Sequence, residues 1–392
     1  MSEEARPFRF YDNRQKYLSF VTTCNEKWKI AQRAIEELRH IKPTPPALRI
    51  FDAGMGDGTL LSHIMRASHK LFPTVPLYVV GKEISLEDIR LSLDKLPDRF
   101  VEHTATVVVF TNLYYANAPW LRRAKKDLAI NWTDLPLHGN TAAEFGEQLR
   151  DLDTQLVDGW RVRPSARTGN PLYETPSVLV IYRADQDFVL NSIKPRSEDV
   201  AADFDLVLVS QPWRARIPAH FKVKNVLEPM SRALAPGGRA LIAQSIGNDP
   251  GLELIRQIWP DEDPFQVTRH ELIQTLKQTL GERANDYRIS GVSDSDALLS
   301  YQMHTLPDEI QSSIGTSTLF AAWNAAIYVA QVEDERLEPV LSSGEYLEHT
   351  SRILRKYGGL WFNDEVFVIA KRARLQNGPQ QPSKPILKEL RP

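Results

Sequence analysis

The sequence predicts an α/β fold in which an open, mainly parallel sheet carries helices on both faces. Short apolar runs that would form buried strands alternate with segments of helical spacing. The first of these runs ends at Asp52 and passes through a glycine turn into a helix-like segment. The composition, 42% hydrophobic and 25% charged over 392 residues, is typical of a globular protein that buries a large core.

The N-terminal part is expected to form a helical lid. Residues 13–40 have helical spacing, with Tyr17 among the apolar positions. A stiff segment with three prolines, residues 41–46, then leads into the first strand. We expect residues 11–28 to close over a ligand at the sheet edge. The Tyr17 hydroxyl would then bind that ligand, or the side chain would only pack between lid and sheet.

The stretch ALRIFDAGMGDGTL, residues 47–60, is the most informative part of the chain. A buried strand ends at Asp52, and the turn after it contains three glycines, Gly54, Gly56 and Gly58. Such a turn lets a ligand approach the backbone at a helix N-terminus. The second strand, residues 77–80, is followed by Glu83, and an acid at this place can accept hydrogen bonds from ribose hydroxyls.

The charges beside this turn favour a cationic ligand over a dinucleotide. Dinucleotide sites use G-x-G-x-x-G, but here Gly58 comes one residue early and Thr59 stands where that pattern has glycine. Asp52 and Asp57 would also place negative charge beside a diphosphate. A glycine turn that joins a strand to a helix without binding anything remains the alternative.

The string Asp52-x-Gly54-x-Gly56-x-Gly58 resembles motif I of the class I S-adenosylmethionine (SAM) dependent methyltransferases. Later segments resemble that family in the same order. They are strand four with its loop (203–213), a helix and a Pro-Gly-Gly turn before strand five (223–244), and two short strands joined near Asn363-Asp364 (359–371). The resemblance implies a Rossmann-like seven-stranded sheet, SAM as the cofactor, and an enzyme that transfers a methyl group.

The resemblance also implies roles for single residues. Asp52 and the three glycines would hold the aminoacyl end of SAM, and Glu83 would hold the ribose. Asn112 and Leu113, which follow the third strand within residues 103–115, would meet the adenine. The alternative for Asn112 is that it only caps a turn.

The loop Ser210-Gln211-Pro212-Trp213 ends strand four, where the transferred methyl group points in this architecture. It is faintly similar to the N-P-P-Y loop of amide and adenine N-methyltransferases, although Gln211 replaces the first residue and the second proline is absent. We expect Ser210 to contact the cofactor, and Gln211 and Trp213 to position the acceptor. Trp213 would otherwise be packed at the rim of the core.

One elaborated domain is expected, in seven segments. These are a helical lid (1–45), the first half of the SAM-binding domain (46–118), an insertion (119–200), the second half (201–247), a mostly helical insertion that covers the substrate (248–345), a C-terminal helix with strands (346–375) and a disordered tail (376–392). Both insertions leave the sheet near the carboxyl ends of strands, where open parallel sheets bind ligands.

Composition argues against several classes of partner. The net charge of −2 predicts no basic surface for nucleic acid. The single cysteine, Cys24, excludes an internal disulfide and a thiolate zinc site, and the histidines show no metal spacing. Without a signal peptide or a membrane-length apolar run, a cytoplasmic protein is expected. The apolar helix at 319–331 fits either the core or a homodimer interface.

We therefore expect methylation of a small-molecule acceptor at nitrogen, oxygen or a carboxyl group, because enclosing insertions suit a small ligand. Three alternatives remain open. The first is transfer of an aminopropyl or aminobutanoyl group, which needs an acid after strand four that Ser210 and Gln211 do not supply. The second is a protein or RNA methyltransferase, which needs an extended or basic cleft. The third is a non-catalytic interaction module of the same fold.

Overall fold

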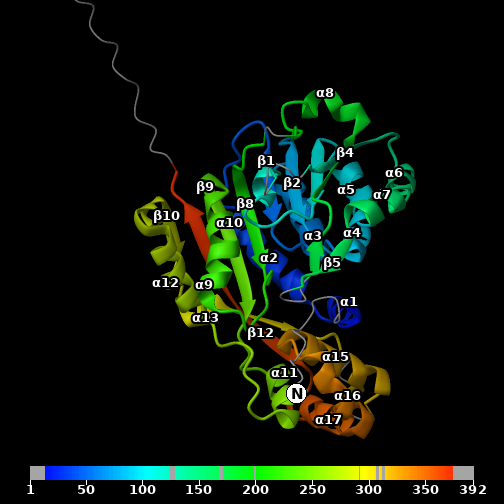
Figure 1. Ribbon diagram of the computed structural model, residues 1–392, viewed down its shortest axis with the longest axis vertical. Coiled ribbons are helices and arrows are strands. Elements are labelled where there is room, and N and C mark those ends of the chain that lie inside the picture. Colours follow the sequence, from blue (N-terminus) through cyan, green and yellow to red (C-terminus); the bar gives the residue numbers. More distant parts are fainter. Residues whose placement is uncertain are drawn as a thin grey trace, which may run out of the picture.

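A ten-stranded sheet forms the centre of the molecule (Figure 1). The computed structural model describes residues 14–123, 129–166, 171–197, 200–290, 292–305, 309–310 and 314–373. The tail expected to be disordered, 376–392, lies outside these ranges. Five parallel strands lie in the spatial order β3 (Thr106–Thr111), β2 (Leu77–Lys82), β1 (Leu48–Asp52), β8 (Phe204–Ser210) and β9 (Leu234–Ser245). This is the order expected for a Rossmann-like sheet.

Strands at both edges make the sheet wider than the seven strands expected. At one edge, β12 (Trp361–Lys371) runs antiparallel to β9, and its two halves pair with β10 (Tyr287–Ser290) and β11 (Leu298–Gln302). At the other, β7 (Ser177–Arg183) runs antiparallel to β3 and parallel to β4 (Asn131–Leu137). The segment 119–200 therefore extends the sheet, and it also holds a hairpin of β5 (Val162–Pro164) and β6 (Pro171–Tyr173).

The expectation of two short strands near the C-terminus was wrong. Residues 361–371 form one continuous strand instead of two, because Asp364 is buried and its carboxyl accepts hydrogen bonds from Ser245 and Gln211 instead of facing solvent in a turn. The segment of helical spacing near the N-terminus forms two helices, α1 (Arg14–Thr23) and α2 (Glu26–Leu38). At the break, the backbone of Cys24 and Asn25 pairs with the residues that end β11.

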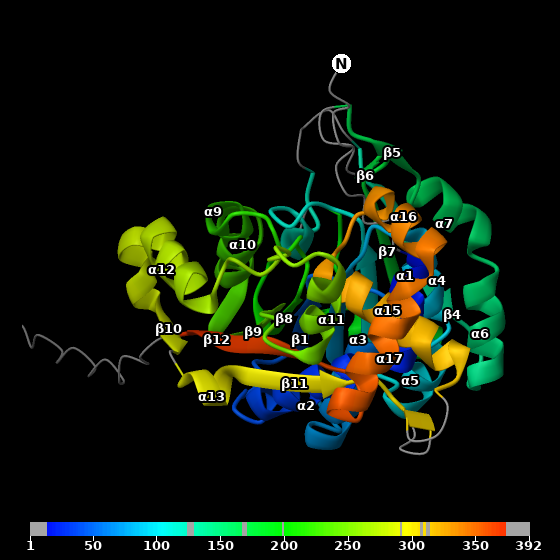
Figure 2. The ribbon, with the colours of Figure 1, turned by 90° about the horizontal axis from the view of Figure 1, so that it is seen from below.

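Helices cover both faces of the sheet (Figures 1 and 2). One face carries α2, α3 (Thr59–Leu71), α4 (Leu86–Leu93), α5 (Leu96–Glu102), α6 (Ala142–Arg150) and α7 (Asp153–Gly159). The other carries α9 (Ala219–Lys222), the π-helical η4 (Val223–Leu227), α10 (Glu228–Arg232) and α12 (Arg269–Leu280). Short elements complete the chain: α8 (Asp187–Leu190), α13 (Asp294–Ala297), η2 (Ala118–Trp120), η3 (Ala184–Gln186), η5 (Gly281–Asp286) and η6 (Asp334–Arg336).

A third group of helices lies at the lower end of the molecule in Figure 1, with α1 between it and the sheet. It contains α11 (Pro250–Ile258), α15 (Thr316–Ala330), α16 (Leu337–Ser343) and α17 (Glu345–Tyr357). The apolar helix considered for a dimer interface is α15, and most of its apolar side chains are buried in the core of this group. In the described ranges, no helix combines the length and apolarity needed to cross a bilayer.

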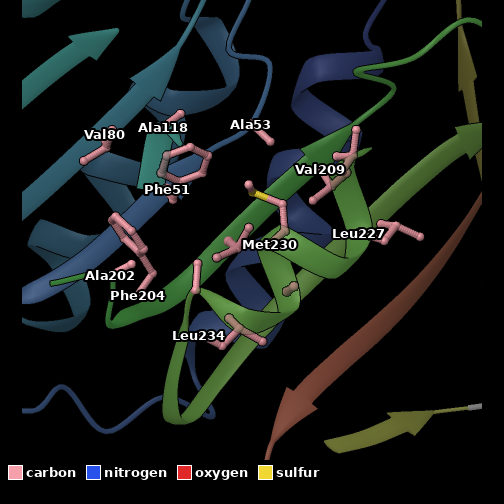
Figure 3. Close-up of a cluster of buried hydrophobic side chains, with 14 of the residues drawn as sticks. Phe51, Ala53, Val80, Ala118, Ala202, Phe204, Val209, Leu227, Met230 and Leu234 are labelled. Carbon is pink, nitrogen blue, oxygen red and sulfur yellow. The ribbon is translucent and has the colours of Figure 1, made fainter. Parts of the chain in front are cut away.

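Each sheet face and the third helical group has its own apolar core. Figure 3 shows part of the core under α10, where Met230 lies near Phe51 and Phe204. The rings of these two phenylalanines, on adjacent strands β1 and β8, are 5.1 Å apart at their centroids. This packing fixes the two strands whose ends carry the glycine turn and the Ser210–Trp213 loop.

Candidate active site

A cavity of about 600 Å³ lies at the carboxyl ends of the parallel strands. Its walls come from the glycine turn after β1, from Lys82 and Glu83 at the end of β2, from the loops after β3 and β8, and from α1, α2, α9, η4 and the end of α15. A cavity of this size is typical of small-molecule sites. The sheet therefore presents its binding edge where an open parallel sheet is expected to.

The glycine turn has the backbone that only glycine adopts freely. Gly56 and Gly58 have φ values of 54° and 76°. A Cβ added to Gly56 would collide with the Tyr17 hydroxyl, and one added to Gly58 would lie 2.6 Å from Ser92 Oγ. Gly54 and Gly56 both line the cavity. Tyr17 and Ser92 therefore pack directly against the turn, while Gly54 and Gly56 also face the cavity.

Asp52 lies directly beneath this turn. Its Oδ1 accepts a hydrogen bond from the Gly54 amide at 3.2 Å, whereas its Oδ2 is buried without a hydrogen-bond partner among the described residues. Burial raises the pKa of Asp52 to about 7, although the Gly54 hydrogen bond and nearby Lys27 oppose this rise. A buried carboxylate oxygen with no donor is an unsatisfied acceptor that a cationic ligand near the turn would stabilise.

Glu83 connects the glycine turn to the next helix. Its Oε2 accepts from the Gly56 amide at 3.0 Å, and its Oε1 accepts from the amides of Ile84 and Ser85 at 2.7 and 2.9 Å. The Ser85 hydroxyl in turn caps α4 through the Asp88 amide. The Glu83 carboxylate is therefore held in one orientation, in the wall of the cavity.

Asn112 and Leu113 differ in their relation to the cavity. Asn112 lines it, but its Nδ2 donates to the carbonyls of Gly159 and Thr175, and its Oδ1 accepts from the Ser177 amide. These contacts tie the end of β3 to the inserted segment. Leu113 is fully buried in the core of the α10 face and does not line the cavity.

The Gln211 amide is committed to contacts inside the chain. Gln211 has a φ of 50°, which is uncommon for a residue other than glycine. Its Nε2 donates to Glu26 of α2 at 3.2 Å and to Asp364 of β12 at 3.0 Å, and its Oε1 accepts from Ser245 at 3.1 Å. The loop after β8 is thereby anchored to both neighbouring elements.

Ser210 and Trp213, the other two loop residues expected to contact ligands, line the cavity and make fewer polar contacts than Gln211. The Ser210 hydroxyl is buried and has no hydrogen-bond partner among the described residues. Trp213 is half-buried, packs against the core of the α10 face, and has the Lys222 ammonium 5.6 Å from its ring centroid.

Tyr17 of α1 packs against the glycine turn. Its hydroxyl accepts a hydrogen bond from the Asp57 amide at 3.0 Å. Its ring centroid lies 5.6 Å from that of Tyr328 on α15, and both residues line the cavity. Helices α1 and α15 therefore form one wall of the cavity together, and Tyr17 contacts both the turn and the neighbouring helix.

Sequence reasoning missed several charged residues of the wall. Lys27 and Glu26, on the first turn of α2, form an ion pair at 3.1 Å. Burial disfavours the charged Lys27, but Glu26, Asp57 and Asp52 outweigh it and raise the pKa of Lys27. Lys82 precedes Glu83 at a strand end, so its position gave a signal. Lys222 and the α2 pair lie on helices far away in the sequence, and no local pattern marks them.

No protein-family model matches the sequence, and no curated protein matches it. Solved structures with some likeness include loganic acid methyltransferase with SAH, which is 10% identical, with 96% of this chain and 99% of that chain covered and a TM-score of 0.39. Another is geranyl diphosphate methyltransferase in complex with GPP and sinefungin (12% identical, 87% and 78% covered, TM-score 0.32). A third is the [4+2]-cyclase SpnF, which is 10% identical, with 95% of this chain and 89% of the SpnF chain covered and a TM-score of 0.33.

Proposed function

We propose that the chain binds S-adenosylmethionine at the glycine turn after β1 and transfers its methyl group to a small-molecule acceptor in the same cavity. One observation carries the proposal. The positive-φ glycine turn and the oriented Glu83 line one end of a cavity of about 600 Å³, and Asp52, which has an unpaired carboxylate oxygen, is buried behind Gly54 without lining the cavity itself.

The charged groups around the turn fit the groups of SAM. Asp52 would stabilise the positive charge of SAM from beneath the turn, and Lys27 in the cavity wall is the cation available for its carboxylate. The Asp57 carboxylate does not line the cavity and is already paired with Lys95 at 3.3 Å, so it contributes only to the local negative potential. Glu83 would accept hydrogen bonds from the ribose hydroxyls. The same set suits a dinucleotide poorly, because two aspartates would lie near its diphosphate.

Bound SAM would supply a methyl group on a sulfonium, and the cofactor carries most of the reactivity. The chain's own residues then have to align the acceptor and exclude water, which contributes several kcal/mol through effective molarity. Tyr17 and Phe20 of α1 and Tyr328 of α15 form a largely aromatic wall suited to excluding water. The loop after β8 is anchored by Gln211 and presents Ser210 and Trp213 to the cavity.

One observation favours a second candidate function, aminopropyl transfer from decarboxylated SAM. Such a reaction needs a carboxylate to activate an amine, and the loop after β8 contains none. The structure brings Glu26 from α2 against Gln211 in the cavity wall, so an acid does reach this place. The ion pair of Glu26 with Lys27 argues for intact SAM, whose carboxylate Lys27 would meet. Incubation with decarboxylated SAM and a diamine distinguishes the two reactions by their products.

Calorimetry on the full chain tests the cofactor directly. We expect SAM and S-adenosylhomocysteine (SAH) to bind with similar strength and NADH not to bind. Binding of NADH without binding of SAM would overturn the proposal. Release of SAH during incubation with SAM and a metabolite panel would then establish methyl transfer, and its absence across acidic, basic and neutral acceptors would favour a non-catalytic module.

Glu83→Gln tests the ribose contact. We expect SAM affinity to fall by roughly 1.5–3 kcal/mol, the usual value of a hydrogen bond to a charged acceptor, which is about a 10- to 150-fold rise in Kd. Asp94→Asn is the matched control, because Asp94 is exposed and does not line the cavity. An unchanged Kd for the Glu83 variant would remove Glu83 from this role.

A further inference from the structure

Two buried ammonium groups line the part of the cavity beyond the glycine turn. Lys82 at the end of β2 is 7% exposed, and Lys222 at the end of α9 is 3% exposed. Within the described part of the chain, neither ammonium has a carboxylate oxygen within 4 Å. The nearest polar contact of Lys222 is Gln244 Oε1 at 3.5 Å. Neither charge is therefore neutralised by a direct ion pair.

One aromatic wall connects the two lysines. Lys82 Nζ lies 4.4 Å from the ring centroid of Tyr115, and the Tyr115 hydroxyl donates to the Pro212 carbonyl at 3.1 Å. The next residue, Trp213, has Lys222 Nζ 5.6 Å from its ring centroid. Tyr115 and Trp213 also pack against the same apolar core. Tyr115, Pro212 and Trp213 thus form a continuous stretch of the cavity wall that runs from Lys82 at the end of β2 to Lys222 at the end of α9.

Burial of these charges is costly for the protein alone. An ammonium removed from water without a paired anion loses much of its hydration energy, and a cation–π contact returns only a small part of that loss. Burial accordingly lowers the pKa of Lys82, against the opposing effect of Glu83. It also lowers the pKa of Lys222 to about 8, against the more distant Glu271 and Glu365. Titratable groups perturbed in this way inside a cleft are typical of functional sites.

The backbone after Lys222 is also unusual. Residues Val223–Leu227 form a π-helical turn. Such turns are rare in proteins, and those that occur are often found at functional sites. Asn225 and Val226 of this turn line the cavity beside Lys222. The segment that follows Lys222 therefore combines an unusual backbone conformation with a place in the cavity wall.

We infer that the acceptor is a small anionic molecule, a carboxylate or phosphate with an apolar or aromatic body. Its acidic group would be held by Lys82 and Lys222, and its body would lie against Tyr115 and Trp213. The role of this anion as the methyl acceptor rests on the proposed function, whereas binding of an organic anion at these lysines does not require methyl transfer.

Binding of four probes to the full chain, with and without saturating SAH, tests this inference by calorimetry. Benzoate and phenyl phosphate carry the proposed acidic group, and benzamide and benzyl alcohol are neutral counterparts of similar size. We expect one or both anions to bind at least tenfold more tightly than the neutral probes. Comparison of benzoate with phenyl phosphate distinguishes a carboxylate site from a phosphate site. Equal or weaker binding of the anions would overturn the inference without any variant.

Variants locate the anion. Lys222→Met and Lys82→Met keep the length of the side chain and remove its charge, and each should weaken anion binding at least tenfold while SAH affinity stays within twofold. Lys222→Arg should restore part of the loss. Lys224→Met is the matched control, because Lys224 is exposed on the same turn and outside the cavity wall. Anion binding that is unchanged in both methionine variants would refute the site.

The two proposals can fail separately. Loss of SAH binding in a chain that still binds benzoate through Lys222 would refute the SAM site and leave the anion site standing. Normal SAH binding with no preference for anionic over neutral probes would refute the anion site and leave the SAM site standing. A fall in SAH affinity in Lys82→Met, without a fall in anion affinity, would place Lys82 at the cofactor and contradict its proposed role.

Discussion

At the scale of single residues, Gly56 combines two constraints that the sequence alone could not separate. Its φ of 54° requires glycine, as the motif predicts. The space where a Cβ would point is filled by the Tyr17 hydroxyl of α1, a contact between residues 39 positions apart that no local pattern encodes. The glycine is therefore needed by the lid as well as by any ligand at the turn.

Gly56→Ala separates these constraints when it is compared with Gly344→Ala. Gly344 has a φ of 73° and nothing within 4 Å of an added Cβ, so its variant measures backbone strain alone, about 1–2 kcal/mol. We expect both variants to lower Tm, and only Gly56→Ala to lose SAM binding, because its Cβ displaces Tyr17 from the turn. Calorimetry on the folded variants gives the answer. Near-normal SAM affinity in Gly56→Ala would place the cofactor away from the turn.

Asp52 should stabilise the cofactor at the expense of the fold. Its pKa is raised to about 7 in the folded chain, against about 3.9 for an unfolded aspartate, so the folded state holds the proton more tightly. Stability therefore falls as pH rises from about 4 to about 7, and the loss is complete above that range. Asp52→Asn removes this cost and should be more stable than the parent chain at pH 8 by about 1–4 kcal/mol.

Denaturant unfolding at pH 8 and pH 4.5 checks this prediction, because the advantage of Asp52→Asn should shrink at the lower pH. The same variant should bind SAM more weakly, since it loses the negative charge beneath the turn. Asp94→Asn, at an exposed position, controls for general effects of charge. A stability difference independent of pH would show that Asp52 titrates normally.

At the scale of elements, the sequence predicts well what local pattern encodes. The parallel strands and the glycine turn follow from apolar runs and residue types adjacent in the chain. The break between α1 and α2 does not, because it depends on pairing of Cys24 and Asn25 with the distant end of β11. Asn363 and Asp364 mislead for a similar reason, since a polar pair typical of a turn is satisfied inside the sheet by Ser245 and Gln211.

The two aromatic residues of α1 should have different roles. Phe20 is 1% exposed and lies in the core of the third helical group, so Phe20→Ala should cost about 3–5 kcal/mol of stability. Tyr17→Phe keeps the ring and removes only the hydroxyl, which accepts from the Asp57 amide at 3.0 Å and donates to the Asp57 carboxylate at 3.4 Å. We expect it to fold normally and to bind SAM up to about tenfold more weakly, because the long bond to the carboxylate adds little to the bond from the amide.

Thermal unfolding and calorimetry on the two variants distinguish these roles. Deletion of residues 1–20 would remove both side chains together and could not separate lid from core. If Tyr17→Phe binds SAM and turns over like the parent chain, the hydroxyl only packs the lid against the turn.

At the scale of the whole molecule, the cavity lies where three separately packed regions meet. The glycine turn, Glu83 and Lys82 belong to the sheet, Lys222 to the helices on one face, and Tyr328 to the third helical group. Sequence reasoning found the sheet's contribution because motifs follow strands. It missed Lys27, Lys222 and Tyr328 because helices place them there only after the three regions have packed together.

This arrangement predicts that ligand binding stabilises the junction between the sheet and the third helical group. Hydrogen exchange with and without saturating SAH should slow in residues 54–58, in α1 and near the end of α15, because Tyr17 and Tyr328 line the same cavity from two of these elements. Exchange in α6 and α12 should stay unchanged, since neither contributes to the cavity wall. The Glu83→Gln variant at the same SAH concentration should show a weaker effect in proportion to its lost occupancy. Protection confined to the glycine turn would mean that α1 and α15 form a fixed wall, and that the acceptor side is as accessible with cofactor bound as without it.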